Sequence, residues 1–262
     1  NGVKNAAGKL QAGGTWQEFT EWPPTDSRPV SYYLSGDRSL TTTAPLEGAF
    51  TYSHDPANPV PTLGGRVSSG LPVQAGPQDQ RCRVELPHCD DNQPLRLRPD
   101  VLVFETPGLE RDLEVSGPVV ARVWVSSSAV DTDFVVKLID QYPPSPDYPE
   151  GYAMNVAEGI VRARFRSFEQ TDSGYRRAYA IKEEPLTPGE VYEVTIDLWS
   201  VSYLFREGHR IRLDVSSSSF PQFDVNPNTG EPFAKRRLPP IVAQNTVYTG
   251  AEQASSIELQ VR

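Results

Sequence analysis

The chain has 262 residues, enough to bury a sizeable core in one large all-β domain or in two smaller domains. Its formal net charge of −9 is spread along the sequence, which argues against a nucleic-acid partner, because such a surface requires a basic stripe. The sequence contains no run of about 18 apolar residues, so it predicts no membrane-spanning helix and no membrane partner.

The N-terminal segment differs in composition from the rest of the chain. Residues 1–14 are rich in Gly, Ala, Lys and Gln, which predicts a mobile segment, and residues 15–262 are predicted to form the folded domain. The sequence starts at Asn1 without an initiator methionine, which indicates a fragment or a processed product. No signal peptide is visible in the sequence, but because the start is that of a fragment or a processed product, this observation does not indicate a cellular compartment.

Period-two alternation and short apolar runs predict a series of strands along the chain. In chain order, the predicted strands cover residues 30–34, 46–52, 101–104, 118–125, 134–139, 160–168, 175–181, 192–199, 210–216 and 256–261. Between the second and third strands, residues 57–76 are rich in Pro, Gly and Ser and predict a long irregular loop or extended arm. Helix is expected only as short turns, within residues 187–191 or 202–206.

Two parts of this pattern carry the fold prediction. Residues 134–139 are apolar on both faces except at Lys137, which predicts a central strand covered on both sides. Residues 192–199 and 210–216 alternate cleanly, and Leu204 and Phe205 are placed in the connection between them. Many strands without helices for parallel crossovers favour an all-β fold, an antiparallel β-sandwich of the jelly-roll type.

The two cysteines lie close together in the sequence. Cys82 and Cys89 enclose a short loop that contains Pro87, a residue that favours a turn. The spacing is compatible with a pair of free thiols or with a disulfide that clamps a surface hairpin. A zinc site is not favoured, because a structural zinc needs four ligands and no second Cys/His pair accompanies His88.

The sequence predicts no catalytic residue, no metal and no cofactor in this chain. It has no Gly-x-Ser-x-Gly elbow, no phosphate-binding glycine loop and no His-Glu-x-x-His. His209 stands at the start of a predicted strand and is interpreted as a loop residue without a catalytic role. The serine run at 216–219 is interpreted as a hydrogen-bonding edge.

Two charged stretches have a structural and a functional interpretation. Asp131 and Asp133 could contribute to a calcium loop, but two neighbouring carboxylates favour a polar turn. In the Ala-Arg-Phe-Arg stretch, alternation places Phe165 in the core and Arg164 in solvent. The basic residues 235–237 are likewise interpreted as a solvated face.

Six stretches in consistent order resemble the C-terminal domain of the CocE/NonD family of serine hydrolases, the X-Pro dipeptidyl-peptidase-like group. They cover residues 16–23, 52–65, 100–118, 123–140, 158–166 and 189–230, the last beginning with GEVYEVTIDLW and ending with FPQFDVNPNTG. The resemblance implies a jelly roll of the galactose-binding-like type. The family's catalytic Ser, Asp and His lie upstream of this region, so no catalytic residue carries over.

The resemblance implies an accessory domain that packs on the α/β-hydrolase domain of the same protein and helps to form its substrate cleft. An ester or peptide substrate would be bound through that domain. Residues 82–92 and 141–151 depart from the family pattern. An alternative is an independent carbohydrate- or ligand-binding jelly-roll module, for which Trp124 and Trp199 could supply an aromatic surface.

The loop after the predicted central strand is the principal candidate for contact with that cleft. Residues 141–155 hold four prolines and the tyrosines Tyr142, Tyr148 and Tyr152, a composition that suits a stiff recognition loop. Phe223 is a further cleft or interface candidate. The competing interpretation is a surface loop whose tyrosines pack on its own prolines.

Overall fold

The computed structural model describes residues 17–66, 73–170, 178–180, 182–232, 235 and 237–262. The predicted mobile segment at residues 1–14 and most of the predicted strand at 175–181 lie outside the described residues. In the described part of the chain, no helix is long and apolar enough to cross a membrane.

The described residues form strands joined by loops, with two short 3₁₀ helices. The strands are β1 (Arg28–Leu34), β2 (Leu40–Thr41), β3 (Gly48–His54), β4 (Leu102–Glu105), β5 (Leu113–Ser127), β6 (Asp133–Tyr142), β7 (Tyr152–Arg162), β8 (Phe168–Gln170), β9 (Ala178–Ala180), β10 (Tyr192–Phe205), β11 (Arg210–Ser216), β12 (Ala243–Thr249) and β13 (Ser256–Val261), and the helices are η1 (Leu95–Leu97) and η2 (Ala163–Phe165). Predicted strands at 30–34, 134–139, 210–216 and 256–261 are confirmed, with some ends shifted by two or three residues.

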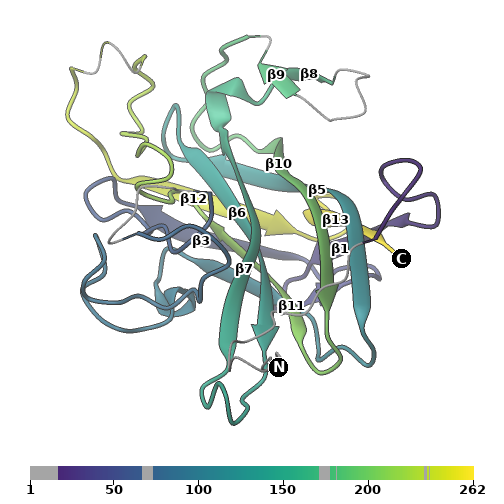
Figure 1. The fold of residues 1–262 in the computed structure, drawn as a ribbon. Coiled ribbons are helices and arrows are strands. Elements are labelled where there is room, and N and C mark those ends of the chain that lie inside the picture. The colour runs from purple at the N-terminus through teal and green to yellow at the C-terminus, as the bar shows by residue number, and fades with distance from the viewer. Residues whose placement is uncertain (1–16, 67–72, 171–177, 181, 233–234, 236) are drawn as a thin grey trace.

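Two antiparallel sheets make up the body of the molecule (Figure 1). The larger sheet has the order β2-β1-β13-β5-β12-β3, with β10 paired to the long strand β5, and the smaller sheet has the order β4-β11-β6-β7. Strands β8 and β9 form a separate hairpin at the top of Figure 1, at the other end of the molecule from the β6–β7 loop. The predicted all-β antiparallel sandwich is confirmed, whereas the jelly-roll type stays a prediction.

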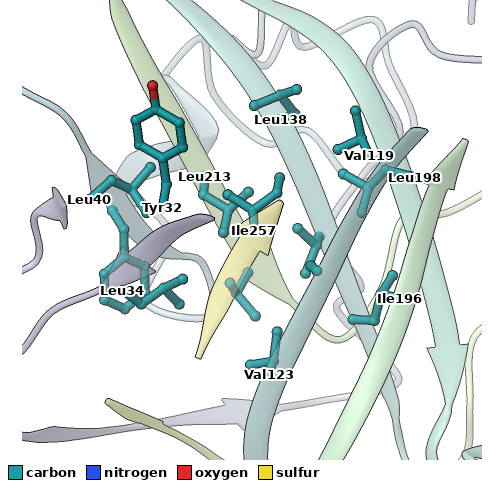
Figure 2. Packing of buried hydrophobic residues seen from close by; sticks show 14 of the residues in the cluster. Tyr32, Leu34, Leu40, Val119, Val123, Leu138, Ile196, Leu198, Leu213 and Ile257 are labelled. Atoms are coloured by element: carbon teal, nitrogen blue, oxygen red, sulfur yellow. The ribbon is translucent and has the colours of Figure 1, made fainter. Parts of the chain in front are cut away.

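The main hydrophobic core lies between the two sheets. Figure 2 shows Leu138 and Leu213 of the smaller sheet near Val119, Leu198 and other residues of the larger one. The alternating apolar set of β10, predicted from its period of two, does face this core. The largest fully buried hydrophobic side chains of this core are Phe104, Phe134, Phe205, Leu34, Leu138, Ile196, Leu198, Ile211, Leu213 and Ile257.

The predicted connection at residues 200–209 is largely strand, and this part of the prediction is wrong. Strand β10 continues to Phe205, which is fully buried, so neither a long loop nor a helical turn at 202–206 is present. The predicted strand at residues 118–125 is also longer than expected, because β5 begins at Leu113 and Gly117-Pro118 lies inside it, opposite the irregularity between Asp197 and Ser200 in β10. A bulge lets both strands continue past this point, because it absorbs the change of register.

Arg164 is buried and Phe165 is only half-buried, so the predicted alternation at this site is wrong. The predicted strand 160–168 ends at Arg162, and the chain turns through η2. In this turn the Arg164 guanidinium points inward and donates hydrogen bonds to the carbonyl oxygens of Gly230 and Glu231 (2.9 and 3.0 Å). A helical turn changes the angular step between side chains, and the period of two no longer applies.

The serine run after β11 is buried, so its interpretation as a sheet edge is wrong, although its hydrogen-bonding role is present. Strand β11 lies between β4 and β6, inside the smaller sheet. The Ser217 hydroxyl lies 2.8 Å from the Tyr52 hydroxyl, and the Ser218 hydroxyl accepts a hydrogen bond from the Val60 backbone N–H. These serines tie the strand end to the neighbouring loops.

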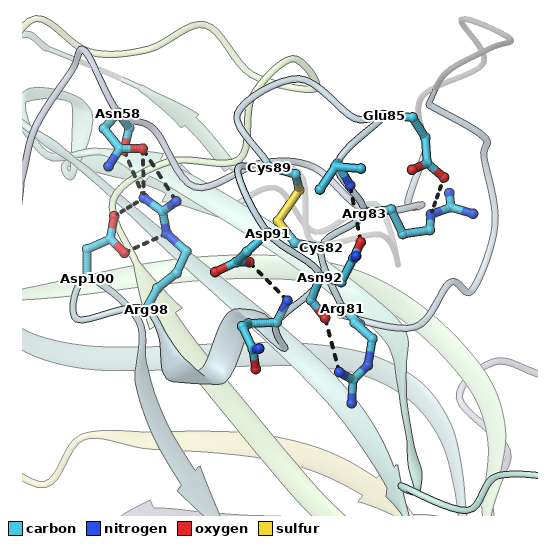
Figure 3. Close-up of a disulfide and its surroundings, with 12 residues drawn as sticks. Asn58, Arg81, Cys82, Arg83, Glu85, Cys89, Asp91, Asn92, Arg98 and Asp100 are labelled. Atoms are coloured by element: carbon cyan, nitrogen blue, oxygen red, sulfur yellow. Dashed lines mark hydrogen bonds and ion pairs between the residues drawn. A yellow bond between two sulfur atoms is a disulfide. The ribbon is translucent and has the colours of Figure 1, made fainter.

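Cys82 and Cys89 form a disulfide, which decides between the two interpretations left by the sequence (Figure 3). The disulfide belongs to a second, smaller apolar cluster that includes Leu63, Leu86 and Leu95. The surrounding arm covers the outer face of the smaller sheet, where the buried amide of Gln80 accepts a hydrogen bond from the Lys137 ammonium (3.1 Å). The predicted double coverage of residues 134–139 is therefore confirmed.

Replacing both cysteines with serine is expected to lower the free energy of unfolding by about 2.5 kcal/mol, the chain-entropy value for a closed loop of about eight residues. Chemical denaturation of the double variant against the wild type in non-reducing buffer measures this loss. The wild type in reductant should lose a similar amount. A double variant as stable as the oxidised wild type would contradict the stabilising role of the disulfide.

Candidate functional site

The three tyrosines selected from the sequence form one aromatic cluster at the end of the β6–β7 hairpin. Tyr142 and Tyr152 are cross-strand partners, and their ring centroids lie 5.6 Å apart. Tyr148, in the loop between them, lies 5.9 Å from Tyr142 and 4.7 Å from Tyr152. The rings therefore pack on one another, and such pairs contribute about 0.5–1.5 kcal/mol each beyond area burial.

A buried polar group supports this tyrosine cluster from below. The Tyr142 ring lies 4.2 Å from the imidazole of His209, whose Nδ1 is 2.9 Å from Oδ1 of Asp140. The Tyr203 hydroxyl donates to Oδ2 of the same carboxyl (2.8 Å). Burial raises the pKa of Asp140, and its hydrogen bonds to Tyr203 and His209 partly offset this effect. Burial and the nearby Asp140 also raise the pKa of Tyr203.

The base of the loop is held by a second set of hydrogen bonds. The Gln141 amide donates to the carbonyl oxygens of Tyr142 (3.3 Å) and Tyr152 (3.5 Å), and its Oε1 accepts from the Arg212 guanidinium (2.9 Å). Arg212 is fully buried and pairs with Asp214. The tyrosine cluster is thus presented on a preorganised support.

His209 was not predicted to be part of this site. From the sequence it was interpreted as a loop residue, whereas the buried Asp140 carboxylate orients its ring. Asp140 directly follows the predicted central strand, which was the available signal, but its partners come 63 and 69 residues later. The His209 ring is hydrogen-bonded to the Asp140 carboxyl and packs on Tyr142, so the pair supports the Tyr142 ring.

Phe223 does not join the tyrosine cluster, but it lies at the end of the same strip of surface. Two hollows follow each other along β7 and β10, with volumes of about 380 and 300 Å³. The first hollow is lined by Met154, which contacts the Tyr142 hydroxyl, and by Tyr203, which is hydrogen-bonded to Asp140. Phe223 lines the second hollow. We define the β7–β10 strip as residues 154–160, 197–203, 222–223 and Arg66.

Trp199 lies between the two hollows and lines both of them. Its side chain is 63% exposed, and its backbone is in the left-handed region with φ of 71°. This conformation costs a non-glycine residue roughly 1–2 kcal/mol. The backbone N–H of Trp199 donates a hydrogen bond to the Asp197 carboxylate (2.7 Å). The Arg66 guanidinium carbon lies 5.0 Å from the centroid of the Trp199 ring. The bulge therefore holds a large apolar ring out in solvent.

The two tryptophans suggested for a sugar-binding surface are separated. Trp124 lies on β5 opposite Glu193, six residues along β10 from Trp199, which corresponds to about 20 Å of strand. Trp124 is half-buried and pairs across the sheet with Tyr248 of β12. Trp199 is thus the one exposed ring of this pair on the strip.

Close contact between β7 and β10 sets the geometry of the strip. A Cβ atom at Gly159 would lie 2.3 Å from the carbonyl oxygen of Asp197, so a larger residue requires a backbone shift. At this point β7, the edge strand of the smaller sheet, contacts β10, the strand that carries the bulge at Trp199. The relative position of the two hollows is therefore defined by backbone contacts.

The Asp131 and Asp133 carboxylates form a buried network with amides and arginines. The Asn226 amide donates to both carboxylates (3.0 and 2.7 Å), and Arg162 pairs with Asp133 (2.9 Å). Burial raises the pKa of Asp131. No group of three or more His, Cys, Asp or Glu residues in the described ranges could hold a metal ion. Both carboxylates are buried and accept hydrogen bonds within this network, and Asp133 is the first residue of β6.

His54 packs against the same network and makes stability dependent on pH. Burial lowers its pKa, and its Nε2 lies 3.3 Å from the Asn226 carbonyl oxygen. The unfolded chain then binds a proton more tightly than the folded protein does, so the unfolding free energy should fall as the pH drops through about 6.5. His54→Gln should show a smaller fall. Denaturation between pH 5 and 8 measures it, and parallel curves for the two proteins would contradict it.

Three comparisons relate the chain to known proteins. Residues 4–258 match the model of the X-Pro dipeptidyl-peptidase C-terminal non-catalytic domain. The chain is 37% identical to cocaine esterase of Rhodococcus sp. over 259 residues, covering 94% of this chain and 40% of the esterase. Among solved structures, an aminopeptidase from a marine sediment archaeon, Thaumarchaeota archaeon, is 31% identical with a TM-score of 0.76, and 98% of this chain covers 39% of it.

An α-amino acid ester hydrolase structure is also similar, with 31% identity and a TM-score of 0.73. The match covers 89% of this chain and 36% of that chain. The chain thus spans about two fifths of the length of the relatives it matches.

Proposed function

Because the chain belongs to the family of X-Pro dipeptidyl-peptidase C-terminal non-catalytic domains, we propose that it packs on an α/β-hydrolase domain of the same protein and helps to form that domain's substrate cleft. Its membership confirms the resemblance to the C-terminal domain of the CocE/NonD hydrolases. The reaction of the whole protein would be hydrolysis of an ester or a peptide bond, carried out by the catalytic domain.

The tyrosine cluster is the observation that supports a role at the cleft. The three rings lie at the end of a two-stranded hairpin, and Tyr142 packs on His209, which is hydrogen-bonded to the buried Asp140 carboxyl. A tyrosine combines a flat apolar body with a hydroxyl group, and rings held in place lose little further entropy when they bind. We propose that Tyr148 and Tyr152 border the cleft.

Tyr148→Ala and Tyr152→Ala in the full-length enzyme are expected to raise KM or lower kcat/KM by several-fold, on the order of 1 kcal/mol of lost binding. Steady-state kinetics on p-nitrophenyl esters and X-Pro-p-nitroanilides measure the effect. Thermal unfolding should show folded variants with a modestly lower Tm, because each substitution removes the packing of that ring on the other two tyrosines. Tyr33→Ala, on β1, is the matched control and should leave the kinetics unchanged. Unchanged kinetics in both loop variants would show that the loop does not border the substrate cleft.

A further inference from the structure

We propose that the β7–β10 strip, with Trp199 and Arg66 at its centre, is the surface on which the catalytic part of the same polypeptide docks. The inference rests on the proposed function and adds to it the residues that anchor the two domains. The tyrosine cluster lies beyond one end of the strip and Phe223 at the other, with the two hollows between them.

Trp199 has the properties of an interface anchor. It is exposed in this chain, yet its backbone is held in a left-handed conformation by the bulge and by the hydrogen bond to Asp197. Strained residues persist where the surrounding structure maintains them, and they concentrate at functional sites. Trp and Arg are also the residue types enriched among those that carry most binding energy at interfaces. The hollows on either side provide concave surface for protruding side chains.

Polar groups along the strip indicate the chemistry of the partner. The Arg66 guanidinium donates to the Glu158 carbonyl oxygen (3.1 Å), and no carboxylate among the described residues forms an ion pair with it. The Gln222 amide nitrogen, in a residue that lines the second hollow, is buried without a hydrogen-bond partner. Both groups are donors, whereas Asn155 Oδ1 and Glu158 Oε1, in residues that line the first hollow, are buried acceptors without a hydrogen-bond partner. The docking face should therefore present apolar side chains, a carboxylate or carbonyl oxygen opposite Arg66 and a hydrogen-bond donor at the first hollow.

The remaining length of the relatives' chains identifies the occupant as the catalytic part of the polypeptide. This chain covers 40% of cocaine esterase and 39% of the archaeal aminopeptidase, so most of each relative lies outside the matched region. A domain joined covalently is present at high effective concentration, which favours docking on any complementary surface. A sugar is less well suited, because Arg66 lies over the Trp199 ring on which it would stack.

Hydroxyl-radical footprinting of the full-length protein tests the inference, with oxidation of individual side chains read by mass spectrometry. Trp22, 38% exposed, is the internal standard of the same residue type. If the strip is covered, Trp199 should be oxidised at least about tenfold more slowly than Trp22. Oxidation of Trp199 faster than that of Trp22, as its 63% exposure in this chain requires, would overturn the inference.

The same footprint separates failure of this inference from failure of the proposed function. If Tyr148 and Tyr152 are protected but Trp199 is not, the proposed packing at the tyrosine loop is supported. The proposal that the β7–β10 strip is the docking surface is then overturned. Exposure of all three side chains would overturn both proposals. Protection of Trp199 that appears only after galactose is added would assign the ring to a sugar and overturn docking.

Trp199→Ala provides an independent test in the full-length protein. Amide hydrogen exchange in residues 154–160 and 197–203 should accelerate at least about fivefold when the anchor is lost. Leu97→Ala is the matched control, because Leu97 is 65% exposed in η1 and lies outside the strip. Equal exchange rates in the wild type and the Trp199 variant would contradict the anchoring role.

Discussion

Replacing Asp214 with alanine is expected to lower the free energy of unfolding by about 3–5 kcal/mol, the cost of leaving a buried charge without its partner. Asp214 accepts two hydrogen bonds of 2.7 Å from Arg212, and both side chains are buried under the arm that covers the smaller sheet. The alanine variant would leave the Arg212 guanidinium in a low-dielectric site, where Oε1 of Gln141 is its one remaining acceptor among the described residues.

Chemical denaturation of Asp214→Ala measures this loss. Asp112→Ala is the matched control, because Asp112 forms a similarly short ion pair with Arg206 (2.6 Å) on the exposed surface. Exposed ion pairs contribute about 0–1 kcal/mol, so the control should be nearly as stable as the wild type. Equal losses of unfolding free energy in the two variants would show that burial of the Arg212–Asp214 pair does not increase its contribution to stability.

The same variant should loosen the tyrosine loop. The Arg212 guanidinium donates a hydrogen bond to Oε1 of Gln141. The Gln141 amide nitrogen in turn donates to the carbonyl oxygens of Tyr142 and Tyr152. Faster amide exchange in residues 141–152 of Asp214→Ala, compared with Asp112→Ala, would follow from this connection. A stability network in the sheet is thereby linked to the proposed recognition loop.

Arg164→Ala is expected to destabilise the protein more than Phe165→Ala, the reverse of the order that alternation in the sequence predicts. Arg164 is 4% exposed, donates to the Gly230 and Glu231 carbonyl oxygens and lies 3.6 Å from the Asp131 carboxylate. Removing it leaves Asp131 without its buried arginine partner, at a cost of about 3–5 kcal/mol. Phe165 is half-buried, and its loss should cost about 1–2 kcal/mol.

Denaturant unfolding of these two single variants decides the order. Arg164→Lys is a useful third variant, because it keeps the charge but loses the planar fork that reaches two carbonyl oxygens. We expect it to fall between the wild type and Arg164→Ala. A larger loss in Phe165→Ala than in Arg164→Ala would restore the order expected from alternation.

The sequence by itself determined the fold class, because strands carry a local period of two. Residues 210–216 and 256–261 alternate clearly enough to define their ends, and residues 134–139 are apolar on both faces because that strand is covered on both sides. The composition of residues 141–155 selected the three tyrosines, but their clustering was not predicted, because β7 begins at Tyr152 whereas the sequence predicts a strand only from residue 160. Tyr142 and Tyr152 end and begin adjacent strands of one hairpin, so a local connection brings them together.

Only the tertiary structure decided which residues from distant segments share a site. His209 meets Asp140 because β11 pairs with β6, and Phe223 shares a hollow with Trp199 because β7 and β10 approach at Gly159. Burial of Arg164 depends on carbonyl oxygens 66 and 67 residues later. Local periodicity reports the direction of side chains within one strand, whereas partners and burial depend on contacts between segments, which no local pattern encodes.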